Sequence, residues 1–461
     1  MLKRYIGDKA FYQRVIAIVL PMIVQNGITN FVSMLDNIMV GQLGTAAMSG
    51  VSIANQLFFV FNICIFGAGA GSGIFTAQFH GSKDHEGVRY TFRFKMIACM
   101  ATAVLGIAVF LAGGEVLLGT FLQGEGDPAM AQETLKSGMS YLQIMLFGLI
   151  PFALKDAYAS TLRETGKTVV PMVAGMSAMF TNLILNAVLI FGLFGAPAMG
   201  IQGAALATVI SRYVELAVVA VWTHRHPEKN PFVPGALRSF HIPGALLKKI
   251  AVKSLPLMFN ECMWSLSMTI INQSYSTCGL DVVPAMNIFT TLKQLTGVAY
   301  LAMGNAVGII MGQTLGADKS PEEARDVNRK LMTVAAGCGL VFAIVSLCMA
   351  DLFPMMYNTT DDIRLMSAQL IRIFALFMPL YAYNHSVYFT LRSGGLILTT
   401  TLYDSISIWV FCVPPVFLLS RLTDIGIIPL FLVGHAIDVI KTILGVYLLR
   451  QGKWIRNLVR K

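Results

Sequence analysis

Charged residues are scarce in this sequence: they make up 13% of its 461 residues, whereas hydrophobic residues make up 56%. A soluble globular domain usually carries about 25% charged residues. The chain also lacks the strict alternation of polar and apolar residues that is typical of transmembrane barrel strands. The composition therefore excludes an ordinary soluble domain and favours helices that cross a lipid bilayer.

Cysteine motifs are missing as well. None of the seven cysteines stands in a C-x-x-C spacing, the pattern that is typical of zinc sites and redox-active pairs. All seven lie in apolar stretches, where cysteine behaves as a small core residue. We therefore expect no disulfide framework, no metal centre of the zinc type and no cofactor.

Apolar stretches of spanning length follow one another along the chain, with short polar breaks between them. Each span needs about 20 residues, so about twelve transmembrane helices fit. We predict an all-α membrane protein with spans near residues 15–40, 49–78, 90–113, 133–160, 167–192, 200–222, 249–275, 283–312, 328–350, 363–390, 398–419 and 426–449.

The net charge of +10 is compatible with a nucleic-acid partner, but its distribution argues against one. Basic residues gather before the first span and after the even-numbered spans, whereas the other breaks are neutral or acidic, as at Glu125 and Asp127. By the positive-inside rule, both termini are predicted to be cytoplasmic, and we expect no cleaved signal peptide. In the first half these basic residues are Lys3, Arg4, Lys9, Arg14, Lys83, Arg89, Arg93, Lys95, Arg163 and Lys167.

Proline and glycine positions reveal an internal repeat. A shift of 235 positions places Pro21 on Pro256 and Gly81 on Gly316, and it also superposes Gly44 on Gly279, Gly73 on Gly308 and Gln78 on Gln313. Proline fixes and glycine frees backbone torsions, so two segments are expected to bend at the same places. Because each copy holds an even number of spans, we predict two parallel six-helix repeats.

The repeat divides the chain into two lobes. Residues 1–222 form the predicted N-terminal lobe with six spans. Residues 223–246 are rich in proline and basic groups, which is typical of a loop, and they are interpreted as a cytoplasmic linker. Residues 247–461 form the predicted C-terminal lobe, which ends in a basic cytoplasmic tail.

Asp36 is the lone carboxylate between Asp8 and Asp84. At mid-membrane depth, an ionised Asp costs roughly 2.5 to 3.5 kcal/mol, so intramembrane carboxylates usually have a function. Asn182 and Asn186 are four residues apart and therefore share one face of a helix. Taken alone, the two amides suit helix packing more readily than function.

The second lobe differs in chemistry, because Ile271 stands where the repeat would place a second Asp36. Its spans instead carry Glu261, Lys293 and His385. These three residues suggest a polar cluster that lines a cleft, with ordinary packing as the alternative.

The sequence resembles the multidrug and toxic compound extrusion (MATE) family, on three motifs and over nearly its whole length. The motifs are Leu20-Pro21, the run from Asp36 to Gly41 and the run from Gly200 to Ala205. The first-lobe carboxylate is more similar to the DinF branch than to the NorM branch. The resemblance implies a cation site of Asp36, Tyr141, Asn182, Asn186 and Thr208, with Pro21 as the bending proline.

Two departures from the family pattern affect these expectations. Many relatives have Asp where this chain has Asn186, so the first-lobe site holds one carboxylate, which suits a sodium ion with oxygen ligands or a proton. The second-lobe site of the NorM branch is not carried over, because Glu261 lies about one turn from the expected position and Tyr381 replaces an Asp. Glu261, Lys293, His385 and Tyr381 remain candidates for the cleft.

We therefore expect a secondary antiporter, not an enzyme, which exports organic and cationic amphipathic compounds in exchange for H⁺ or Na⁺. A flippase for a lipid-linked precursor is the alternative, and a membrane enzyme acting on such a lipid is a weaker one. The expected location is a bacterial inner membrane, in a monomer whose partners are small organic molecules and the lipid bilayer.

Overall fold

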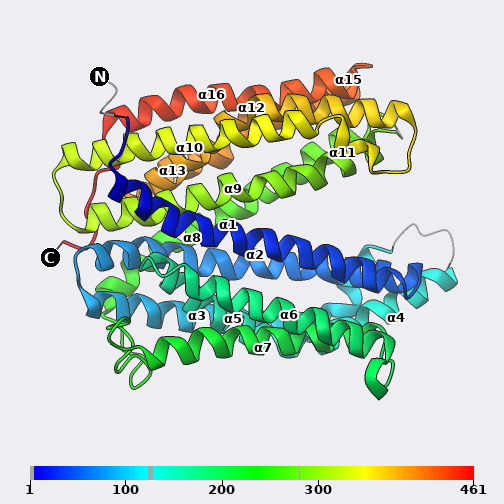
Figure 1. Cartoon of the computed structure of the whole chain (residues 1–461), viewed down its shortest axis with the longest axis horizontal. Coiled ribbons are helices and arrows are strands. Elements are labelled where there is room, and N and C mark those ends of the chain that lie inside the picture. Colours follow the sequence, from blue (N-terminus) through cyan, green and yellow to red (C-terminus); the bar gives the residue numbers. More distant parts are fainter. Residues whose placement is uncertain (1–4, 123–127, 280, 461) are drawn as a thin grey trace. The chain divides into compact units, whose positions relative to one another are not determined.

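A computed structural model describes residues 5–122, 128–279 and 281–460. All regular elements in these ranges are helices (Figure 1). Lys3, Arg4, Glu125 and Asp127, which entered the charge argument, lie outside the described residues. The predicted all-α class is thereby confirmed.

The described residues of the first half form seven α-helices. In order, they are α1 (Lys9–Gly41), α2 (Thr45–Gly81), α3 (His85–Thr120), α4 (Pro128–Met145), α5 (Leu149–Glu164), α6 (Val169–Phe191) and α7 (Ile201–Arg225). The 3₁₀ turn η2 (Leu146–Gly148) joins α4 to α5, and η3 (Leu193–Gly195) follows α6.

The second half begins with α8 (Gly244–Ser276), α9 (Val282–Gly316), α10 (Pro321–Met349), α11 (Leu352–Met355) and α12 (Asp361–Ser393). The span expected near residues 398–419 is not one regular helix. It consists of α13 (Ile397–Thr401), the π-helical segment η4 (Leu402–Ile406), α14 (Ser407–Phe411) and α15 (Val413–Leu422). The last helix is α16 (Ile427–Gln451).

Eleven helical stretches in the described part of the chain are long and apolar enough to cross a membrane. Helix α8, with 33 residues, is a further long helix, so the expectation of about twelve spans holds. The repeat is visible in the helix bounds: a shift of 235 positions converts the bounds of α1 into those of α8. Both helices contain the matched proline, Pro21 or Pro256.

The helices form two compact units, which are described separately. The first-repeat unit comprises Val24–Thr76 and His85–Ser254, and the second-repeat unit comprises Met1–Ile23, Ala77–Asp84 and Leu255–Lys461. The unit boundaries fall inside α1, just after Pro21, and inside α8, just before Pro256. The two lobes inferred from the sequence stay a prediction.

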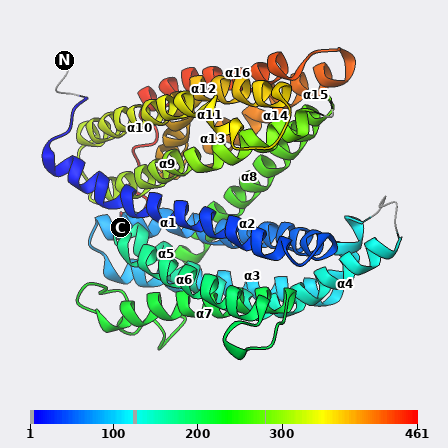
Figure 2. The same cartoon turned by 45° about the vertical axis from the view of Figure 1, so that its right-hand side comes forward.

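In the first-repeat unit, α6 packs against α7, and α5 packs against α3 and α7 (Figure 2). Its core is apolar and includes Phe58, Phe61 and Leu149. Lys95 is completely buried, where it forms an ion pair with Glu164. Such a pair satisfies a charge that would otherwise be expensive to bury.

Three of the basic residues that follow the second predicted span lie in a helix. Arg89, Arg93 and Lys95 belong to the first three turns of α3. Arg93 donates hydrogen bonds to the carbonyl oxygens of Gly235, Ala236 and His241 at 2.8 to 2.9 Å. Helix α3 begins at His85, before its apolar stretch. The side chains of Arg93 and Lys95 therefore lie on a helix, where they are bonded to other groups of the same chain.

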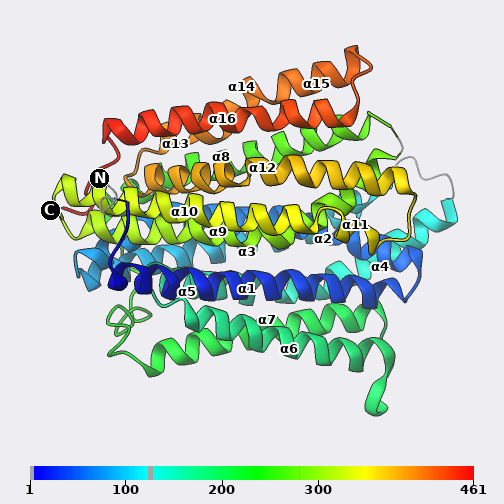
Figure 3. The ribbon, with the colours of Figure 1, turned by 45° about the horizontal axis from the view of Figure 1, so that its top comes forward.

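In the second-repeat unit, α12 packs against α9, α10 and α16 (Figure 3). The repeated Gln and Gly residues meet here, because a Cβ atom on Gly81 would collide with the backbone of Gln313, and one on Gly316 with that of Gln78. Glycine therefore allows the ends of α2 and α9 to approach each other closely.

The side chain of Gln78 also holds the end of the chain. It donates to the carbonyl oxygens of Ser393 (2.8 Å) and Arg456 (3.1 Å), and it accepts from the backbone nitrogen of Leu458 at 2.7 Å. The matched Gln313 accepts from Arg14 at 2.7 Å. The residues that share a place in the repeat thus bind different partners.

Candidate functional site

Four predicted residues of the first lobe form one hydrogen-bonded chain that joins α1, α6 and α7. Asn186 Nδ2 donates to Asp36 Oδ1 at 2.6 Å and to Asn182 Oδ1 at 3.1 Å. Asn182 Nδ2 donates in turn to Thr208 Oγ1 at 3.2 Å. The four-residue spacing on α6 therefore aligns both amides toward Asp36 and Thr208, as expected for one helical face.

Tyr141, the fifth predicted residue, lies on α4 and is buried. Its ring lies beside Thr208 and within electrostatic range of Asp36. Its hydroxyl donates a long hydrogen bond of 3.5 Å to Asn55 Oδ1 of α2. Sequence reasoning had not singled out Asn55, because one amide in an apolar helix is a weak signal.

The arrangement suits a single exchangeable positive charge. Asn182 and Asn186 are only 4% and 2% exposed, and Asp36, to which Asn186 donates, is half-buried. In surroundings of this kind a carboxylate is costly unless it is hydrogen-bonded or neutralised. Asn186 Oδ1 has no hydrogen-bond partner among the described residues, and it is the amide nitrogen of Asn186 that faces Asp36.

The four second-lobe candidates are linked through aromatic rings in the second-repeat unit. Tyr388 donates to Glu261 Oε1 at 3.0 Å, and its ring stacks on His385 at 6.2 Å between centroids. Tyr300 contacts both His385 (6.0 Å) and Tyr381 (6.2 Å). Glu261, His385 and Tyr381 therefore belong to one contiguous group.

Lys293, the fourth candidate, lies among aromatic rings. Its Nζ is 5.9 Å from the ring centre of Phe289 and 5.7 Å from that of Phe374. Cation–π contacts of this kind stabilise an ammonium group in an apolar environment. Phe374 also contacts Tyr381, with ring centres 5.5 Å apart, so Lys293 lies beside the same cluster, whose function stays a prediction.

Sequence reasoning missed the strongest polar cluster of this unit, which lies on η4, α8 and α16. Asp404 accepts from Lys441 Nζ at 3.1 Å through Oδ1 and from Asn260 Nδ2 at 3.1 Å through Oδ2. Asp438, one turn before Lys441, lies beside Asn384. The signal was available, because Asp404 and Asp438 are carboxylates inside predicted spans, as Asp36 is.

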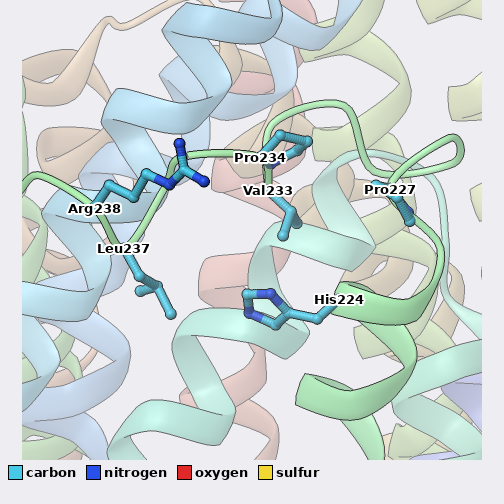
Figure 4. A pocket seen from close by; sticks show the side chains of 7 residues that line it. His224, Pro227, Val233, Pro234, Leu237 and Arg238 are labelled. Carbon is cyan, nitrogen blue, oxygen red and sulfur yellow. The ribbon is translucent and has the colours of Figure 1, made fainter.

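The proline-rich segment between α7 and α8 forms a small pocket of the first-repeat unit (Figure 4). It is lined by His224, Pro227, Val233, Pro234, Gly235, Leu237 and Arg238. His224 shares a hydrogen bond of 2.9 Å with Tyr158, and His226 contacts the carbonyl oxygen of Trp222 at 2.9 Å. In the described part of the chain, no three His, Cys, Asp or Glu residues are placed to hold a metal ion.

Comparison with known proteins gives one family and a consistent set of relatives. The model of the family MatE matches twice, over residues 21–188 and 256–418. The two matches begin 235 positions apart, which is the spacing of the repeat. Together they cover well over half of the chain.

Two bacterial relatives match along almost the whole chain. A probable multidrug resistance protein NorM of Thermotoga maritima is 24% identical over 455 residues, which cover 97% of this chain and 94% of the relative. The probable multidrug resistance protein YoeA of Bacillus subtilis is also 24% identical, over 96% of this chain and 94% of its own.

Solved structures share the fold. An outward-facing multidrug resistance MATE family transporter of the MOP superfamily superposes with a TM-score of 0.85 at 19% identity, over 97% of each chain. A MOP superfamily transporter from Pyrococcus furiosus, for which reverse polarity of the binding pocket suggests a different function, gives 0.82 at 18% identity over 98% of this chain and 97% of that one. At these identities the likeness shows the fold alone.

Proposed function

The chain belongs to the MatE family, and we propose that it is a secondary antiporter that exports organic, cationic and amphipathic compounds in exchange for an inward-moving ion. The family consists of membrane transporters, not enzymes. The names of the relatives, as multidrug resistance proteins, support export of drug-like compounds.

The observation that carries the proposal is the hydrogen-bonded chain from Asp36 through Asn186 and Asn182 to Thr208. It supplies one ionisable group in an apolar helix layer, fixed by neutral partners. Burial disfavours the charged form of a carboxylate, whereas water stabilises it. Two conformations that differ in the access of water to Asp36 therefore differ in their affinity for the ion. Asp36 is accordingly the coupling residue of the proposed exchange.

The orientation of Asn186 favours a proton over a sodium ion. Its amide nitrogen, a hydrogen-bond donor, faces Asp36, whereas a hard cation such as sodium is bound by oxygen atoms. Binding of sodium would require the Asn186 amide to turn over and present Oδ1. Binding of a proton to Asp36 requires no such change.

In the proposed cycle, Asp36 takes up the ion when its site is open to the outside and releases it to the cytoplasm. Neutral Asp36 is stable in apolar surroundings, which favours the conformation that expels substrate. Pro21 lies fifteen residues earlier on the same helix, about four turns away, and removes one backbone hydrogen bond. We assign it the role of the bending point of α1.

The remaining expectations complete the proposal. The protein resides in the bacterial inner membrane with both termini in the cytoplasm, and it acts as a monomer without a nucleic-acid partner. The DinF-like branch remains the assignment that the lone first-lobe carboxylate favours. Coupling by H⁺ or Na⁺ is decided by the following experiment.

The test compares wild type with Asp36→Asn in liposomes. Efflux of a fluorescent cationic dye is measured under an imposed proton gradient and, separately, under a sodium gradient. We expect the proton gradient to drive wild-type efflux, and Asp36→Asn to retain less than a tenth of it. A matched control, Asp362→Asn, changes an exposed carboxylate at the start of α12 and should transport normally.

Two outcomes would overturn parts of this proposal. Wild type that moves no dye under either gradient would reject drug antiport and direct the search to lipid-linked substrates. Asp36→Asn that remains fully coupled would reject the assigned role of Asp36, even if export itself is real.

A further inference from the structure

Asp438, in the middle of α16, is a buried carboxylate with little support from the protein. It is 4% exposed, and its Oδ2 atom has no hydrogen-bond partner among the described residues. Oδ1 accepts one long hydrogen bond, 3.4 Å, from the neutral amide of Asn384, and the hydroxyl of Tyr381 is a second neutral donor beside the carboxylate. A charged carboxylate whose donors are neutral, and one of whose oxygens has no partner, is only partly compensated for its loss of hydration.

Asn384 is held in place and has no further hydrogen bonds to give. Its Nδ2 also donates to the backbone oxygen of Asp438 at 3.0 Å. Its Oδ1 accepts from the hydroxyls of Tyr403 (3.1 Å) and Thr442 (3.0 Å). The amide cannot turn to present its oxygen to Asp438 without breaking four hydrogen bonds.

The other intramembrane carboxylates of the second-repeat unit are better satisfied. Asp404 has a donor on each oxygen, namely Lys441 and Asn260. Glu261 accepts from Tyr388. Lys441 is the cation nearest to Asp438 in sequence, but its ammonium group is already paired with Asp404.

The groups that face Asp438 come from several elements. The cations within electrostatic range are Lys293 of α9 and Lys441 of its own helix. Neutral titratable groups face it from α8, α9, α12, η4 and the residue before α15, namely Tyr275, Tyr300, Tyr381, Tyr403 and Cys412. Neither lysine forms an ion pair with Asp438 among the described residues.

This environment suits a proton better than a metal cation. A hard cation binds several oxygen ligands at once, whereas the nearest amide oxygen is already occupied by two hydroxyls. The two lysines oppose a metal ion and a proton alike, so the preference rests on the oxygen ligands. A proton requires only one free carboxylate oxygen, which Asp438 Oδ2 provides.

We propose that Asp438 is a second proton-binding carboxylate, distinct from Asp36, and that it loads and releases one further proton in each transport cycle. The proton binds at Oδ2 from water in one conformation and returns to water in the other, and no other bond forms or breaks. The inference rests on the proposed ion-coupled export and adds a site in the second-repeat unit.

The direct test is infrared spectroscopy of protein reconstituted in lipid, with the aspartates labelled by ¹³C. A protonated aspartic acid gives a carbonyl stretch that an ionised one lacks. Above about pH 6, where exposed aspartates stay ionised, we expect Asp438→Asn to lose one pH-dependent band of wild type, whereas the exposed control Asp362→Asn keeps every such band. An Asp438→Asn spectrum identical to that of wild type would overturn the proposal.

A second measurement does not depend on folding of the Asp438 variant. Asp36→Asn removes the first proposed proton site and should retain one pH-dependent aspartic acid band, which arises from Asp438. If Asp36→Asn shows no such band, Asp438 carries no proton and the inference is wrong.

Transport stoichiometry separates this inference from the proposed function. The number of protons per exported dye molecule follows from the dye gradient that balances a known proton gradient. We expect it to fall from two in wild type to one in Asp438→Asn. Wild type that exports dye under neither gradient would contradict the proposed function, whereas wild type that is coupled to sodium alone, or a proton-coupled Asp438→Asn with unchanged stoichiometry, would contradict only the second proton site.

Discussion

The Asp36 site and the cluster around Asp404 and Asp438 occupy the two copies of one repeat, yet they are built differently. The first uses one carboxylate, two amides and a hydroxyl on regular helices. The second uses two carboxylates and a lysine, with Asp404 on the π-helical segment η4. Duplication preserved the bounds of α1 in α8 and the proline inside each, whereas the buried polar groups diverged.

The difference in helix regularity has a physical basis. Helix α6, which carries Asn182 and Asn186, is continuous over 23 residues. The matched stretch from Ile397 to Leu422 is broken by η4. π-Helical turns are rare in proteins overall, and those that occur often lie at functional sites. Here the segment includes Asp404, which meets both Asn260 and Lys441.

Of the variants that distinguish the two sites, Asp404→Asn is expected to have the largest effect, which is on the free energy of unfolding. The substitution leaves Lys441 without its carboxylate partner, although its side chain is only 9% exposed. Breaking a buried ion pair in this way costs about 3 kcal/mol of unfolding free energy. Thermal unfolding in detergent should show a markedly lower midpoint than wild type, whereas Asp36→Asn, which has no cationic partner, should unfold close to wild type. Equal midpoints would refute the structural role of the Asp404 pair.

A smaller effect is expected from the matched prolines. Pro21→Ala restores a backbone hydrogen bond in the helix that carries Asp36 and should slow dye efflux about tenfold, which corresponds to about 1.4 kcal/mol in the barrier. Pro256→Ala changes the matched helix, which carries Ile271 in place of a carboxylate, and should slow efflux less. Initial efflux rates at saturating dye measure both variants, and equal slowing would indicate that the two bends act together.

The smallest effect is expected from Thr208→Val at the far end of the Asp36 chain. The substitution removes the acceptor of Asn182 Nδ2 and costs about 1 kcal/mol. Because Asp36 keeps its own bond from Asn186, coupled efflux should fall only a few-fold, with unchanged protons per dye molecule. A complete loss of coupling would show that Thr208 belongs to the ion site itself.

Much of the first-lobe site was accessible from the sequence. Asp36 stands out because a single carboxylate in an apolar stretch is visible without coordinates, and the spacing of Asn182 and Asn186 defines a helical face. The partners from other helices, Thr208 and Tyr141, came from the resemblance to a family. The order of hydrogen bonds among them depends on side-chain geometry that no spacing encodes.

The second-repeat unit was predicted less completely. Glu261, Lys293 and His385 were noticed because each is polar within a span, but the same criterion should have drawn attention to Asp404 and Asp438. The break at η4 has no simple sequence signature, since Leu402–Ile406 contains no proline or glycine. Burial of Lys95 was likewise hidden, because basic residues at a span boundary usually lie in the polar interface.

Helices α2 and α9, which contain 37 and 35 residues, are much longer than a membrane requires. At 1.5 Å per residue, each measures about 55 Å, whereas the hydrocarbon layer is about 30 Å thick. Each is therefore a stiff rod that projects well beyond the lipid tails. When such a helix tilts, its projecting end moves further than the part inside the lipid tails.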